Sequence, residues 1–131
     1  MKAFLSLELQ LKNELMTTVR LAVGGAASAA GLSYDDGEDC KVCVTESLLL
    51  LSRRGFKGAR ISFSEEKGLG VCVEGISKEG EEHTEGDEIS VALLNALASG
   101  VVLERKGGSV NKITFRFVAE KGTSANYLQN T

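Results

Sequence analysis

The sequence of 131 residues contains no proline, one histidine and three cysteines. Without proline, the ends of helices and strands have to be set by glycine and by clusters of polar residues. Three cysteines cannot all pair with one another, which argues against the disulfide framework of a small secreted protein. His83 has no serine or cysteine motif beside it that would indicate a nucleophilic triad, so we expect it in a solvated loop.

The chain also lacks a strong charge of one sign and a long apolar run. Its 15 Lys and Arg residues against 18 Asp and Glu residues give a formal net charge of −3, which does not favour binding to nucleic acid or to an anionic membrane. Met1 leads directly into an alternating segment instead of a signal peptide, so we expect a cytoplasmic protein. The length predicts a single domain over residues 1–118, followed by a flexible C-terminal tail at 119–131.

The apolar periodicity predicts the order strand, helix, helix, hairpin, helix, hairpin. Strands are expected at 4–11, 59–64, 69–73, 101–105 and 110–118. Helices are expected at about 14–30, from 36–39 to 53, and at 87–99, with an acidic loop at 34–38 and with Asn13 and Asp87 as caps. The predicted fold is an α/β (α+β) two-layer sandwich, in which three helices cover one face of a five-stranded mixed, mostly antiparallel sheet.

Cys40 and Cys43 form a C-x-x-C pair. A zinc site would need two further ligands, and only Cys72 and His83 remain. A redox pair would normally start a helix just after a strand, whereas both cysteines fall inside a predicted helix. We therefore predict that they are small buried apolar residues, and we expect no metal site.

The second predicted helix carries Glu46, then Leu50 four residues later, then the sequence Arg54-Gly55-Phe56. This layout, together with the element order between about Leu5 and Phe117, resembles the anti-sigma-factor serine kinases of the histidine-kinase-like (GHKL) ATPase fold. That family has a Glu at the first position, an Asn at the second and often a His at the third, followed by Gly and an aromatic residue. The resemblance implies the same fold for this chain.

The resemblance also implies a catalytic remnant at Glu46. In the family the Glu is the proposed general base and the Asn helps to hold magnesium on the phosphates. Here Leu50 replaces the Asn, and a leucine cannot ligate a hard cation that requires oxygen donors. We expect Leu50 to pack in the core, because it belongs to a run of four leucines.

Remnants of a nucleotide site are expected at Glu74, Gly75 and Gly86. The family reads adenine with an Asp followed by glycines, where this chain has Glu74-Gly75. A glycine-rich box leads into the third helix of the family, and here only Gly86 remains, with Glu88 in place of a glycine. The loop before that helix is acidic and should repel phosphates.

Two functions follow from the resemblance. The first is an anti-sigma-factor-like regulatory protein, a pseudokinase that binds a sigma factor or a STAS-domain antagonist, needs no cofactor and can form a homodimer. The alternative is a divergent ATP-binding serine kinase or ATPase that uses Glu46 as its base, with ATP and magnesium. The loss of the Asn at Leu50 favours the first, so we lean toward a protein without enzymatic activity.

Overall fold

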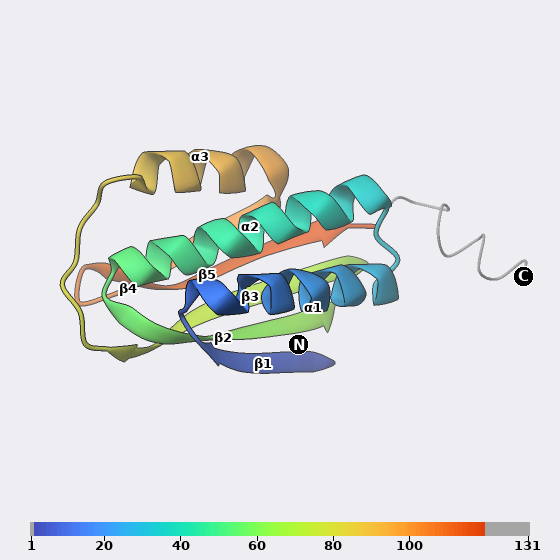
Figure 1. The fold of residues 1–131 in the computed structure, drawn as a ribbon. Helices are drawn as coiled ribbons and strands as arrows, with labels where there is room; N and C mark the ends of the chain where they lie inside the picture. Colours follow the sequence, from blue (N-terminus) through green and yellow to red (C-terminus); the bar gives the residue numbers. More distant parts are fainter. Residues whose placement is uncertain (1, 120–131) are drawn as a thin grey trace, which may run out of the picture.

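A computed structural model describes residues 2–119, and it confirms the predicted fold class. Three α-helices lie on one face of a five-stranded sheet (Figure 1). The strand order is β1-β2-β3-β5-β4, and every neighbouring pair is antiparallel. The elements are β1 (Leu5–Gln10), a 3-10 turn (Asn13–Leu15), α1 (Met16–Ala29), α2 (Tyr34–Arg53), β2 (Phe56–Glu65), β3 (Gly68–Lys78), α3 (Asp87–Leu97), β4 (Ser99–Lys106) and β5 (Ser109–Val118). The predicted tail lies outside the described residues, except for residue 119.

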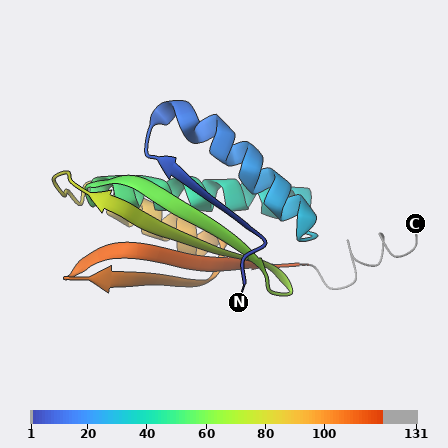
Figure 2. The same ribbon diagram turned by 90° about the horizontal axis from the view of Figure 1, so that it is seen from below.

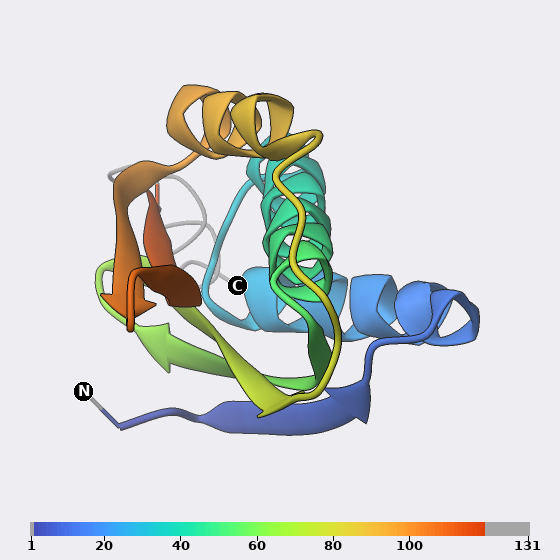
Figure 3. The same cartoon turned by 90° about the vertical axis from the view of Figure 1, so that its left-hand side faces the viewer.

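The sheet curves around α2, with α1 and α3 at the two sides of that helix (Figure 3). Seen from below, the strands lie in front of α2 and α3 (Figure 2). Ile61, Val73 and Ile113 are paired across the three central strands and are fully buried. Because successive side chains of a strand point to opposite faces, their neighbours point away from the helices.

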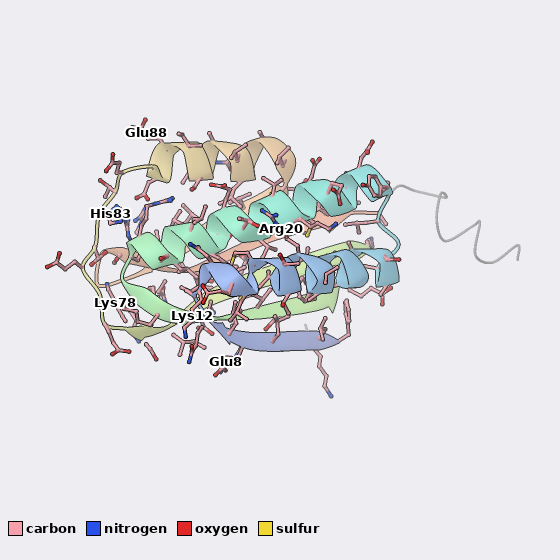
Figure 4. All side chains as sticks on the ribbon, in the orientation of Figure 1. Glu8, Lys12, Arg20, Lys78, His83 and Glu88 are labelled. Carbon is pink, nitrogen blue, oxygen red and sulfur yellow. The ribbon has the colours of Figure 1, made fainter. Side chains whose placement is uncertain are left out.

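Those outward neighbours form a row of alternating charge across all five strands. The register places Glu8 beside Arg60, Arg60 beside Glu74, Glu74 beside Lys112, and Lys112 beside Glu104. Nη2 of Arg60 lies 2.8 Å from Oε1 of Glu8, and Nη1 of Arg60 lies 3.8 Å from Oε1 of Glu74. Figure 4 shows Glu8 pointing away from the helix layer. We call this set the charged row.

The start of α2 differs from the prediction, since residues 34–38 are helical and do not form a loop. Ser33 is the N-cap, with extended backbone angles, and its side-chain oxygen accepts a hydrogen bond from the Asp36 N–H at 3.1 Å. The acidic residues that indicated a loop instead occupy the first turn, where the helix dipole favours negative charge. Asn13 does not cap α1 with its side chain either, because it begins the 3-10 turn that precedes this helix.

The first hairpin is longer than its alternating pattern indicated. β2 begins at Phe56 and β3 continues to Lys78, so the connection to α3 shrinks to residues 79–86. Gly75 interrupts the apolar pattern, but a side chain there would come within 2.6 Å of the Phe56 ring. The glycine therefore makes space for an aromatic residue. α3 ends at Leu97, earlier than expected, because the chain turns extended at Ala98 and enters β4 at Ser99.

The core lies between α2 and the sheet. Cys40 and Cys43 are fully buried, which confirms that they are core residues. Of the four leucines at 48–51, only Leu49 is exposed. Between residues 2 and 119, no helix is both long and apolar enough to cross a membrane.

Candidate functional site

The resemblance predicts that Leu50 stands where the family has its magnesium-binding Asn. Its side chain is 2% exposed and belongs to the hydrophobic core. The predicted burial of Leu50 is confirmed. A hydrocarbon side chain at this depth offers no oxygen to a cation.

Glu46 lies one turn earlier on α2 and faces α3. Its Oε1 accepts a hydrogen bond of 2.8 Å from the hydroxyl of Ser90, which is 1% exposed. The same hydroxyl accepts a 2.6 Å hydrogen bond from Nη2 of Arg53. The carboxylate that would act as a general base is therefore already bound within the chain.

Asp87 is held by two arginines from the end of α2. Arg53 Nε donates to Oδ1 at 2.8 Å, and Arg54 Nη1 donates to Oδ2 at 2.9 Å. The prediction that Asp87 caps α3 is wrong: the N-cap is Gly86, with φ of 95°, and no side chain caps this end. The carboxylate is drawn away from the helix N–H groups because two cations face it. We call Arg53, Arg54 and Asp87 the arginine cluster.

Residues 79–86 lie directly on the C-terminal end of α2. The Gly55 carbonyl accepts hydrogen bonds from the N–H groups of Glu79 and Gly80, both at 2.9 Å, and the Arg53 carbonyl accepts one from His83 at 3.0 Å. Gly55 has φ of 86°, and a side chain there would collide with the Gly80 carbonyl. His83 is exposed, as predicted, and Figure 4 shows it on the connection between Lys78 and α3.

Glu82 joins this segment to three other parts of the chain. It accepts a hydrogen bond from Ser109 in the last hairpin, pairs with Lys78 at 3.1 Å, and lies 3.6 Å from Nε of Arg54. The hydrogen bond from Ser109, followed by that from Lys78, lowers the pKa of Glu82 below its usual value. The segment is therefore fixed to β3, to the β4–β5 turn and to α2.

The structure separates the residues that the resemblance groups as a nucleotide site. Gly86 lies near Glu46, because Arg53 contacts both the Gly86 carbonyl, at 3.4 Å, and Ser90. Glu74 belongs to the charged row on the opposite face of the sheet, and Gly75 lies against Phe56. Their roles as nucleotide remnants stay predictions, but Glu74 and Glu46 do not share a cleft.

Sequence reasoning missed the arginine cluster. The only signal was the pair of adjacent cations, Arg53 and Arg54, at the end of the second predicted helix. Their partner is 33 or 34 positions away, on another helix. No local pattern specifies such a contact.

The element order and the sheet are those of a histidine-kinase-like α+β sandwich, and polar side chains of α2 and α3 contact one another. Over 54 residues the chain is 39% identical to the serine-protein kinase RsbW of Listeria monocytogenes and of Listeria innocua. The match covers 41% of this chain and spans about a third, 34%, of the length of those relatives. A scan against models of protein families gives no match.

Proposed function

We propose that this chain is an anti-sigma-factor-like regulatory protein that binds a sigma factor or a STAS-domain antagonist without phosphorylating it. The observation that carries the proposal is Leu50, which is buried and apolar at the position of the family's metal ligand. A kinase scaffold without this metal ligand keeps the surfaces through which it binds other proteins. It loses the stabilisation of the phosphates that a magnesium ion held by the Asn would provide during phosphoryl transfer.

The similarity to a serine-protein kinase supports the scaffold part of the proposal, since the matching relatives are named for that activity. The interactions around Glu46 support the proposed absence of kinase activity. Its carboxylate contacts Ser90, and the segment where phosphates would approach lies on the end of α2. That segment carries Glu79, Glu81, Glu82 and Glu85, which repel phosphates.

The second candidate is a divergent serine kinase or ATPase, and the observation that favours it is Glu46 itself. The carboxylate is half-buried at the surface of α2, and a rotation of Ser90 would free it. The position of Glu74 on the outer face of the sheet does not support this candidate, because no adenine reader then faces Glu46.

Isothermal titration of the protein with Mg-ATP separates the two candidates. We expect no saturating isotherm in the micromolar range, because each lost contact weakens affinity and about 1.4 kcal/mol corresponds to a factor of ten. The same titration of Leu50→Asn shows whether restoring the oxygen donor is sufficient. A saturating micromolar isotherm with the unmodified protein would overturn the regulator proposal in favour of the kinase.

A further inference from the structure

The face of the sheet that points away from the helices carries a second feature besides the charged row. No described helix covers this face (Figure 3). The row beside the charged row, read across β2, β3 and β5, consists of Ser62, Cys72 and Thr114. The row after that one, read across the same strands, consists of Ser64, Gly70 and Arg116. Because most of these side chains are short, the surface is lower here than at the charged row.

The two rows line a cavity of about 340 Å³, which we call the sheet cavity, and two glycines help to form it. A side-chain carbon at Gly70 would lie 2.5 Å from Oε2 of Glu66 and 2.8 Å from Oγ of Ser64. At Gly100 on β4, such a carbon would collide with the guanidinium of Arg116. The missing side chains therefore allow Glu66 and Arg116 to lie along the surface of the sheet, over two different strands.

Glu66 and Arg116 line the sheet cavity with opposite charges that are not neutralised within the described chain. Between residues 2 and 119, neither side chain forms an ion pair, with the other or with a third residue. The carboxylate lies over Gly70 on β3 and the guanidinium over Gly100 on β4, with β5 between these strands. Two strand spacings correspond to about 10 Å. The two groups are thus too far apart to pair, but a molecule between them can contact both.

The charged row does not supply the missing partners, because its members face one another. Arg60 contacts both Glu8 and Glu74. Nζ of Lys112 lies 4.0 Å from Oε2 of Glu104. The sheet cavity therefore has one cation and one anion of its own, with hydroxyl groups and a thiol between them. A ligand of one charge would be attracted by one end of this cavity and repelled by the other.

We propose that the sheet cavity binds a short linear zwitterion, whose carboxylate contacts Arg116 and whose ammonium group contacts Glu66. A guanidinium offers two parallel N–H groups to a carboxylate. If each contact is about 3 Å long, the charges of the ligand have to be about 4 Å or more apart. An α-amino acid is too short for this, whereas an ω-amino acid with a longer chain or a dipeptide fits. The inference goes beyond the proposed function, because the cavity lies on the side of the sheet away from Glu46.

Alkylation of Cys72, which lines the cavity, tests the site. Cys40 and Cys43 are fully buried, so iodoacetamide should modify only Cys72 in the folded protein. We expect γ-aminobutyrate and ε-aminocaproate to slow this reaction several-fold and to saturate in the millimolar range, since exposed ion pairs are weak. Butyrate and butylammonium, which carry one charge each, should not slow it at equal ionic strength. No protection by the zwitterions, or equal protection by a singly charged compound, would overturn the proposal.

Three variants test the two contacts separately. Arg116→Gln and Glu66→Gln each remove one charge, and each should abolish the protection of Cys72 by the zwitterions. Arg105→Gln is the matched control, because Arg105 is an exposed arginine on β4 that does not line the cavity. The reaction rate without ligand is measured for every variant, since a nearby charge also changes the reactivity of a thiol. Protection that persists in Arg116→Gln or in Glu66→Gln would refute the corresponding contact.

The length of the ligand distinguishes contact at both ends from contact at one end. Glycine should protect Cys72 less than γ-aminobutyrate does, because its two charges cannot reach both side chains. Equal protection by glycine would refute simultaneous contact. Glycylglycine is compared at the same concentration: stronger protection than with γ-aminobutyrate assigns the cavity to short peptides, and weaker protection assigns it to ω-amino acids.

Nuclear magnetic resonance replaces alkylation if Cys72 does not react in the folded protein. The amide signals of Gly70, Gly100 and Arg116 should then shift saturably with γ-aminobutyrate or ε-aminocaproate, and they should not shift with butylammonium. Unchanged signals up to high millimolar concentration would overturn the site. The titration with Mg-ATP and the capture of a protein partner are separate measurements, so failure here leaves the proposed function standing.

Discussion

Neighbouring leucines on α2 differ sharply in environment. Leu50 is 2% exposed, whereas Leu49 is 43% exposed. Leu50→Asn should therefore lower the free energy of unfolding by about 2 kcal/mol or more, because an amide is placed in the core without partners. Leu49→Asn, which introduces the same group at the surface, should change it by about 0.5 kcal/mol or less. Denaturant melts of both variants check the prediction, and equal losses would contradict it.

The three cysteines should differ in reactivity. Burial raises the pKa of Cys40 and of Cys43 to about 12, and neighbouring acids add to the effect. Cys72 is only partly buried. At pH 8 a thiol reagent should label Cys72 first and reach the other two only as the protein unfolds. Labelling of all three at one rate in the folded protein would contradict this.

The same shifts predict a loss of stability in alkali. Thiols whose pKa is raised on folding, from 9.0 to about 12, stabilise the protein fully below pH 9 and lose that contribution as the pH rises toward 12. The denaturation midpoint should therefore fall above pH 9. Cys40→Ala or Cys43→Ala should reduce the slope of that fall, whereas Cys72→Ala should affect it less.

The sequence predicted several buried positions from side-chain type. The run of four leucines and the small apolar nature of cysteine indicated burial at Leu50, Cys40 and Cys43, and the structure confirms it. The environment of Asp87 was predicted wrongly, because its type suits a helix cap and equally an ion pair. Two arginines on another element decide between these roles, and only the tertiary structure brings them close.

At the scale of elements, segment 79–86 depends on Gly55. This residue has φ of 86°, and its own carbonyl accepts the two hydrogen bonds that hold Glu79 and Gly80. Gly55→Ala combines backbone strain with a collision against the Gly80 carbonyl. Gly107→Ala carries the strain alone, because φ is 62° and no atom lies within 4 Å of the added carbon.

We expect Gly107→Ala to cost about 1–2 kcal/mol of unfolding free energy, the usual cost of a left-handed alanine. Gly55→Ala should cost at least about 1 kcal/mol more, and it should also speed hydrogen exchange at Gly80. Calorimetry and exchange together check this. Equal costs for the two variants would show that the contact between Gly55 and Gly80 does not hold the segment.

Periodicity predicted the middle of each element better than its ends. The strand centres around Ile61, Val73 and Ile113 were evident from alternation, because one face of the sheet is buried. The ends at Phe56 and Lys78 were missed, because Gly58 and Gly75 have no side chain that could continue the pattern. The start of α2 was also predicted wrongly, because it is set by one capping hydrogen bond to the hydroxyl of Ser33, which apolar periodicity does not indicate.

For the whole molecule, the helix layer carries exposed apolar side chains on all three helices. Leu21 on α1 is 74% exposed, Leu49 on α2 is 43% exposed and Ile89 on α3 is 66% exposed. If the proposed protein partner docks on this layer, Leu21→Asp and Ile89→Asp should weaken its capture by about tenfold or more without loss of the fold. Val102→Asp, at a 50% exposed position in β4, is the control.

Co-purification followed by mass spectrometry measures this capture. The proposal expects a sigma factor or a STAS-domain protein, recovered less by the two helix variants than by the control. If both helix variants recover the partner as well as the control does, the partner does not bind to the helix layer. Recovery of neither class of partner would contradict the proposed function itself.

The charged row ends in an acid on both sides of the sheet, with Glu8 on β1 and Glu104 on β4, each more than half exposed. If a second molecule extended the sheet by placing its β1 along the β4 of the first, these two glutamates would become neighbours in one continuous row. Like charges side by side on adjacent strands destabilise their pairing. The charged row therefore disfavours end-to-end growth in the register that aligns Glu8 with Glu104, and this effect should weaken in acid or at high salt.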